Sequence, residues 1–229
     1  MGTDDIFKRK KGVRKKRKEN LRQVAPHRYL IVCEGERTGK NYFNGVKRKV
    51  EAKYKNKIDV KNPIELEVIG TGRNTESLIS YAARTRSLSE IPYGRVWVVF
   101  DKDDFSDEQF NNAIYKAKAE DMDVAWSNEA FELWFLLHFE YLNSAIDRSQ
   151  YKVKLDEYFS KHGINSGKYE KNLPNIFELL CEGGKLEKAI KWSEKLHKWH
   201  REQCVTTESK MNPCTTVYEL VGELLEYID

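Results

Sequence analysis

Four short apolar runs that alternate with helical stretches are the feature that most constrains the fold of this chain. The runs cover residues 28–33, 64–68, 96–100 and 124–126. Between and after them, apolar residues recur at helical spacing over 40–54, 76–88, 107–120 and 130–139. Apolar strands that alternate with helices are typical of a parallel sheet covered on both faces. The sequence therefore predicts an α/β fold with a central, mostly parallel four-stranded sheet.

The second half of the chain carries a different pattern. After Tyr141 no further strand is indicated, and residues 151–159, 175–181, 186–200 and 215–227 all have helical spacing. With 229 residues, the chain is long enough for one domain with an elaboration. We predict an α/β domain over residues 26–141 and a helical elaboration over 142–229 that packs on it.

The first 25 residues form a basic segment. Residues 1–22 contain ten Lys or Arg and three acids, a net charge of +7, which leaves −3 on the other 207 residues. Such a run buries too little apolar surface to fold alone, so residues 1–25 are predicted to be a disordered arm. Its cations serve either solubility or contact with nucleic-acid phosphates.

Several classes of protein are disfavoured. No stretch approaches the roughly 20 apolar residues of a membrane span, and no apolar segment follows the basic N-terminus, so we expect a cytoplasmic protein without a membrane partner. The four cysteines include no CxxC pair, which argues against a zinc site or a disulfide framework: Cys33, Cys181, Cys204 and Cys214.

Acids follow two of the predicted strands. Glu34 comes directly after the first strand and precedes Gly35, while Asp101 and Asp103 follow the third. The carboxyl ends of parallel strands gather functional groups at one edge of a sheet. Carboxylates without Cys or His suit Mg²⁺ or Mn²⁺. A single such Asp is often only a turn or cap residue, but the combination favours a metal site for phosphodiester chemistry.

These acids resemble those of the Toprim domain, in which a Glu follows the first strand and a DxD follows a later one. A closer resemblance, to the RloB-like family related to an abortive-infection (AbiL) component, spans roughly residues 26–225. Its motifs are YLIVCEGERTGKNYF (29–43), VWVVFDKDD (96–104), SNEAFELWFLLHFE (127–140), KYEKN (168–172) and NPCTTVYELV (212–221). Glu129 departs from the third motif, where Pro is expected.

The resemblance implies a Toprim-like (Rossmann-like) fold and a role in bacterial anti-phage defence. It also implies a Mg²⁺-dependent nuclease acting on DNA or RNA, possibly tRNA, with an ATPase partner encoded nearby. Glu34, Asp101 and Asp103 would hold the metal.

Other residues are candidates of second rank. Glu132 either completes the catalytic set or is an ordinary Glu in the first turn of a helix. His138 is better explained as a core histidine than as a catalyst. Five cations are candidate phosphate contacts, although a solvated surface explains them nearly as well: Arg37, Lys40, Arg73, Lys168 and Lys171.

One alternative function stays open. A non-catalytic nucleic-acid-binding or regulatory subunit of a defence complex would use the arm and a degenerate metal site for binding only. Nucleotidyl transfer would need nucleotide contacts that the sequence does not reveal, and a topoisomerase would need a gate that 229 residues cannot supply.

The basic arm generates a first prediction. Deleting residues 1–22 should weaken binding to nucleic acid of any sequence, because fewer counterions are then released. The affinity of the full and shortened chains for one duplex, measured across a salt series, tests this. A salt dependence that is unchanged by the deletion would make the arm a solubility device.

Overall fold

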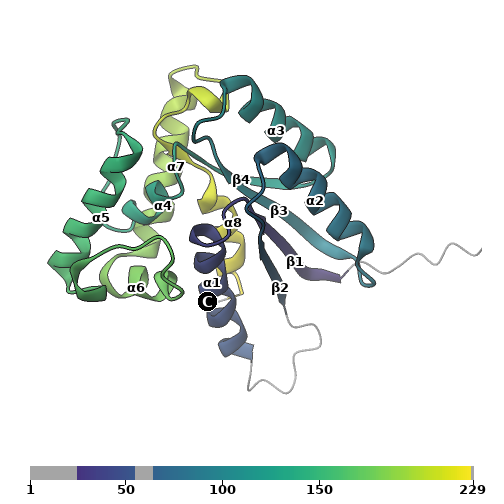
Figure 1. Cartoon of the computed structure of the whole chain (residues 1–229), viewed down its shortest axis with the longest axis horizontal. Coiled ribbons are helices and arrows are strands. Elements are labelled where there is room, and N and C mark those ends of the chain that lie inside the picture. The colour runs from purple at the N-terminus through teal and green to yellow at the C-terminus, as the bar shows by residue number, and fades with distance from the viewer. Residues whose placement is uncertain (1–24, 55–63, 228–229) are drawn as a thin grey trace, which may run out of the picture.

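The computed structural model describes residues 25–54 and 64–227 (Figure 1). Apart from Ala25, which begins the first strand, the predicted arm lies outside the described residues. Within the described ranges, no helix has the length and apolar character needed to cross a membrane.

Strands and helices alternate through the first half of the chain. The order is β1 (Ala25–Cys33), α1 (Thr38–Tyr54), β2 (Glu65–Gly70), α2 (Thr75–Leu88), β3 (Tyr93–Asp101), α3 (Asp107–Ala119), β4 (Asp123–Asn128) and α4 (Glu132–Leu136). The second half contains α5 (Arg148–His162), α6 (Ile176–Gly183), α7 (Leu186–Glu202), β5 (Cys214–Thr215) and α8 (Val217–Leu225). Two 3₁₀ turns, η1 (Asn165–Gly167) and η2 (Glu208–Lys210), lie between these elements.

The strands form one sheet in the order β2-β1-β3-β4-β5. The first four strands are mutually parallel, and β5 is antiparallel to β4. β1 pairs with β2 on one side and β3 on the other, so that Cys33 lies opposite both Gly70 and Val99. The carboxyl ends of all four parallel strands therefore meet at one edge, and the predicted α/β class is confirmed.

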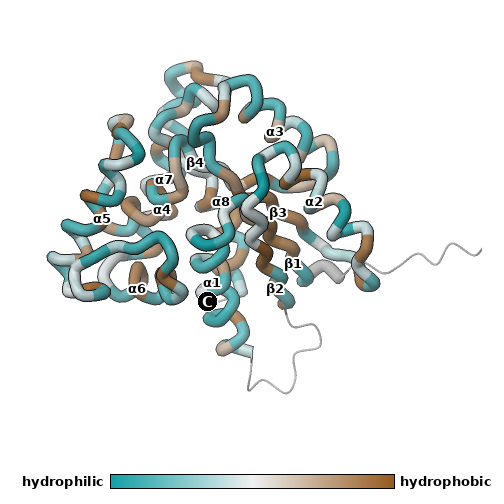
Figure 2. The backbone as a smooth tube through the Cα atoms, viewed as in Figure 1, coloured by the Kyte–Doolittle hydropathy of each residue, from teal (hydrophilic) through white to brown (hydrophobic). Residues whose placement is uncertain are grey.

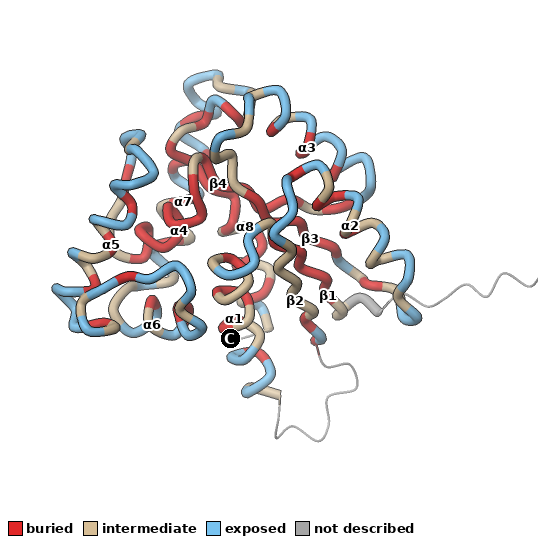
Figure 3. The backbone as a smooth tube through the Cα atoms, viewed as in Figure 1, coloured by how far each residue is buried: buried red, intermediate tan, exposed pale blue. Residues whose placement is uncertain are grey.

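Alternate side chains of the strands feed two apolar layers. Tyr29, Ile31 and Cys33 face a layer built by α1, α4, α5, α6, α7 and α8. Leu30 and Val32 face a second layer built mainly by α2 and α3. Apolar and buried positions coincide along β1, β3 and α4 at the centre of the molecule (Figures 2 and 3). This alternation of period two fixes the register of the sheet.

The fifth strand was not predicted. Residues 214–215 were expected to continue without a strand into a helix over 215–227, but they extend the sheet beside β4, and α8 begins only at Val217. Hydrogen bonds that no local pattern announces hold this segment: the Trp126 amide donates to Thr216 Oγ1 at 3.0 Å, and the Thr216 amide donates to the Trp126 carbonyl at 2.9 Å. Pairing with β4 therefore decides the structure of these residues, although their apolar spacing predicted a helix.

The helix predicted over 130–139 is also shorter than expected. Only Glu132–Leu136 is α-helical, and both ends are tight turns in which Leu133 donates to Ala130 and Phe139 donates to Leu136. His138 lies beyond this helix and is buried, with Nδ1 2.9 Å from the Trp134 carbonyl oxygen. The interpretation of His138 as a core residue is confirmed.

Two helical glycines with opposite surroundings provide a test of the packing. A Cβ on Gly45 of α1 would lie 2.3 Å from Phe177 Cβ, whereas a Cβ on Gly222 of α8 would meet nothing within 4 Å. We expect Gly45→Ala to lower the free energy of unfolding by about 1–2 kcal/mol, because overpacking exceeds the gain in helix propensity.

The matched variant Gly222→Ala should raise the free energy of unfolding by about 0.5–1 kcal/mol through propensity alone. Urea unfolding of both variants beside the wild-type protein gives the comparison. Two changes of the same sign would contradict the close contact between α1 and α6.

Candidate functional site

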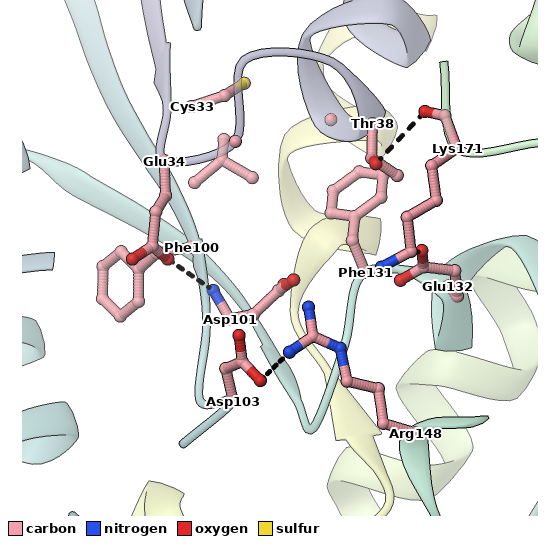
Figure 4. A pocket seen from close by; sticks show the side chains of 13 residues that line it. Cys33, Glu34, Thr38, Phe100, Asp101, Asp103, Phe131, Glu132, Arg148 and Lys171 are labelled. Atoms are coloured by element: carbon pink, nitrogen blue, oxygen red, sulfur yellow. Dashed lines mark hydrogen bonds and ion pairs between the residues drawn. The ribbon is translucent and has the colours of Figure 1, made fainter. Parts of the chain in front are cut away.

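A cavity of about 160 Å³ opens at the carboxyl edge of the sheet (Figure 4). β1 and β3 supply its floor, the segment that enters α4 supplies one wall, and α5 and the loop before α6 each reach in with one cation. Its charged lining residues are Glu34, Asp101, Asp103, Glu132, Arg148 and Lys171. The structure therefore brings the four predicted acids together around one cavity.

Glu34 is positioned by the continuation of the sheet. Its amide donates to the Val99 carbonyl at 2.8 Å, and its own carbonyl accepts from the Gly72 amide at 2.8 Å. The carboxylate accepts from Thr75 Oγ1 at 3.3 Å and from the Asp101 amide at 3.3 Å. Burial raises the pKa of Glu34, and these two donors act in the opposite direction.

Asp101 ends β3, and its surroundings disfavour the negative charge of its carboxylate. Its Oδ1 is buried and has no hydrogen-bond partner among the described residues. Burial, followed by repulsion from Glu132 and Glu34, raises the pKa of Asp101 well above its usual range. A buried carboxylate oxygen without a donor is costly unless a cation or a proton satisfies it.

Asp103 is held by an ion pair. Its carboxylate contacts Arg148 at the start of α5, and its amide donates to the Glu129 carbonyl at 3.0 Å. We expected strand geometry to carry Asp101 and Asp103 to one side. Instead β3 ends at Asp101 and Asp103 has φ of 41°, a left-handed conformation that Asp tolerates. Both nevertheless line the cavity, and Lys102 turns away to Asp107.

Glu132 is a buried acid with two partners. Only 5% of its surface is exposed, Tyr169 donates to Oε1 at 3.1 Å, and Lys171 Nζ lies 3.5 Å from the same oxygen. Glu132 is the first residue of α4, as an ordinary first-turn Glu would be, and it also lines the cavity, as a member of the catalytic set would. An exposed first-turn Glu would need neither partner.

The donor set fits a hard divalent cation in its chemistry. Four carboxylates share the cavity, and one of their oxygens is buried without a partner. As arranged, however, no three His, Cys, Asp or Glu side chains of the described residues are close enough to ligate one ion. Glu34 turns towards backbone and Thr75 donors and Asp103 towards Arg148, so ligation would require these side chains to turn inward.

The five predicted phosphate contacts do not all gather at the cavity. Lys171 lines it. Lys40 packs its stem near Gly70, Arg73 lies 4.9 Å over the Tyr81 ring, and Arg37 is exposed outside the lining, as is Lys168. Of these five cations, only Lys171 is placed to act at the acids themselves.

Sequence reasoning missed three residues that shape the site. Arg148 pairs with Asp103 across 45 positions, Thr75 donates to Glu34, and Tyr169 donates to Glu132. The only local signal was at Tyr169, which lies inside the KYEKN motif. Nothing near Arg148 or Thr75 in the sequence points towards the acids.

The model of one protein family, described as RloB-like protein, matches residues 29–224. The chain belongs to the RloB-like protein family. No curated protein and no solved structure matches it. The matched region contains every cavity-lining residue, so the acids and their two cations all lie within the family's own domain.

The unsatisfied Asp101 oxygen predicts a stability effect. At pH 7.5 and in EDTA, Asp101→Asn should raise the free energy of unfolding by about 1–3 kcal/mol, because it removes a buried charge that faces two other acids. Added Mn²⁺ should stabilise the wild-type protein but not the variant, since a ligand stabilises the state that binds it.

Asp104→Asn is the matched control, because Asp104 is exposed and does not line the cavity. It should change stability by no more than about 0.5 kcal/mol and keep the response to Mn²⁺. If Asp101→Asn destabilises the protein, or leaves the Mn²⁺ response intact, the account of the acid cavity is wrong.

Proposed function

We propose that this protein is a divalent-metal-dependent nuclease that hydrolyses phosphodiester bonds in DNA or RNA, with Mg²⁺ or Mn²⁺ as its cofactor. The observation that carries the proposal is the buried, unpartnered Asp101 oxygen in a cavity shared with three more carboxylates. Such a costly cluster persists where function requires it. The order of acids along the chain resembles that of Toprim nucleases.

Glu34, Asp101 and Asp103 would hold the metal. When bound, the ion would supply a Lewis acid for the phosphoryl oxygens and lower the pKa of the attacking water. Burial raises the pKa of Glu34, which places this carboxylate closer to the range of a general base. Glu132 is held by Tyr169 and Lys171 and would orient a ligand or a water from the opposite wall.

Arg148 and Lys171 have a second role in this proposal. Each now neutralises one acid, Asp103 and Glu132 respectively. If Asp103 turned inward as a metal ligand, Arg148 would lose this partner, and its guanidinium would be placed to bind the phosphate of the substrate. Arg148 and Lys171 would thus each exchange a carboxylate of the protein for a phosphate of the substrate.

The proposed biological setting rests on the family resemblance and not on the geometry of the site. We propose that the nuclease serves bacterial anti-phage defence and is restrained by an ATPase partner encoded nearby. A nuclease that cleaves host nucleic acid, such as tRNA, would harm its own cell without restraint.

Cleavage in infected cells tests the proposal. Cells carrying the intact locus with wild-type protein should show new 5′ or 3′ ends in DNA or in total RNA after phage challenge. Glu34→Ala, Asp101→Ala and Asp103→Ala should each abolish these ends, because the acids stabilise transition-state charge. Sequencing of both nucleic-acid pools identifies the substrate.

The control variant is Asp104→Ala, which removes an exposed acid within the same motif and should leave cleavage unchanged. Protection against phage that survives in both Glu34→Ala and Asp101→Ala would exclude the nuclease. A non-catalytic nucleic-acid-binding subunit would then take its place.

A further inference from the structure

A second cavity lies beside the acid cavity and plays no part in the proposed chemistry. It measures about 200 Å³ and is formed where the first turn of α2 faces α3 and the loop before it. The residues that matter for its chemistry are Asn74, Thr75, Phe105, Gln109 and Asn112.

Two connections, one a hydrogen bond and the other the chain itself, join this cavity to the acids. Thr75 lines the second cavity, and its hydroxyl donates to Glu34 Oε1 at 3.3 Å. The end of β3 places Asp101 in the first cavity, and the loop after it places Asp103 in the first cavity and Phe105 in the second. The two cavities are thus adjacent along the end of β3 and its loop, as a phosphate and the base of a neighbouring nucleotide would require.

Phe105 offers a ring that the fold does not use. It is only partly buried, it belongs to neither apolar layer, and it contacts no aromatic ring or cation among the described residues. An aromatic ring that is left open beside a nucleic-acid site is suited to stacking, because every base has a π-face.

Amide groups surround this ring with unused hydrogen-bonding capacity. Within the described part of the chain the Asn112 side chain makes no hydrogen bond. Gln109 uses only Oε1, which accepts from the Ser106 amide, and Asn74 uses only Oδ1, which accepts from Ser77. Free amides offer both donors and acceptors, as the edge of a nucleobase requires.

The charge balance of the second cavity favours an uncharged ligand over a phosphate. Its one cation, Lys116, lies 3.8 Å from Glu76, so the rim is neutral overall. A planar, uncharged group with donors and acceptors on its edge matches this lining, whereas an anion finds no free positive charge.

We propose that this second cavity is a subsite for a nucleobase of a single-stranded substrate, next to the phosphate held at the acids. The base stacks on Phe105, and Asn112 bonds its edge. The inference rests on the proposed function for its substrate class, and it assigns base preference to a site separate from the acids.

Binding to matched strands tests the subsite without any cleavage. The full chain is titrated, in EDTA, with a labelled single strand of 12 nucleotides and with an abasic strand that carries the same phosphates, each made as DNA and as RNA. Wild-type protein should bind at least one base-bearing strand roughly fivefold or more tightly than its abasic counterpart. Phe105→Ala and Asn112→Ala should each bring this ratio towards one.

Two controls match the variants in chemistry. Tyr115→Ala removes an exposed ring from α3 outside the cavity, and Gln203→Ala removes an exposed amide after α7, so both should keep the wild-type ratio. Thermal unfolding checks that all four variants are folded. If Phe105→Ala and Asn112→Ala also keep the ratio, or if no strand binds, the subsite is wrong.

Two further outcomes separate this inference from the proposed reaction. A loss of base preference in Phe105→Ala, with no cleavage in infected cells, would support the subsite and overturn the nuclease. Saturable binding of free adenosine or cytidine without binding of either strand would overturn the subsite as a part of a strand-binding surface.

Discussion

The parallel pairing of β1 with β3 is the constraint on which the rest of the structure depends. It places Cys33 opposite Val99 and lets the Glu34 amide continue the ladder to the Val99 carbonyl. Because both strands run in the same direction, their terminal acids arrive at one edge, and Glu34 accepts a hydrogen bond from the Asp101 amide. The acid cavity is thus a direct consequence of sheet register, and a slip of one residue would turn these side chains to the opposite face.

That arrangement has a cost, which the second half of the chain partly offsets. Asp101 and Glu132 repel each other in a poorly solvated cavity, and Arg148 and Lys171 bring two positive charges to it. Lys171 is held near the cavity by α1, whose Thr38 and Asn41 side chains donate to the Lys171 and Asn172 carbonyls. The helical elaboration therefore does more than cover the sheet. It supplies the cations without which the acids would face one another alone.

The sequence was sufficient for the features that depend on local pattern. Alternating strands and helices predicted the parallel sheet, and the position of Glu34, Asp101 and Asp103 after apolar strands predicted that they would share one edge. It was insufficient wherever a long-range contact decides the outcome. β5 forms because Thr215 and Thr216 bond to β4, and Arg148 enters the site because α5 packs beside α4. Neither contact can be predicted from the spacing or periodicity of the sequence, whereas Lys171 was among the predicted phosphate contacts.

In the proposed nuclease, the two cavities would perform two separate tasks. The charged cavity collects acids whose mutual repulsion is relieved by cations, which suits a reaction at phosphate but carries no information about sequence. The neighbouring cavity is neutral and amide-rich, which suits a base edge but offers nothing to a phosphate. Thr75 connects the two cavities, because its hydroxyl donates to Glu34 and it also lines the second cavity. Because Thr75 is buried, contacts Glu34 and also lines the second cavity, the proposed base subsite and the proposed catalytic acid would be linked through one threonine.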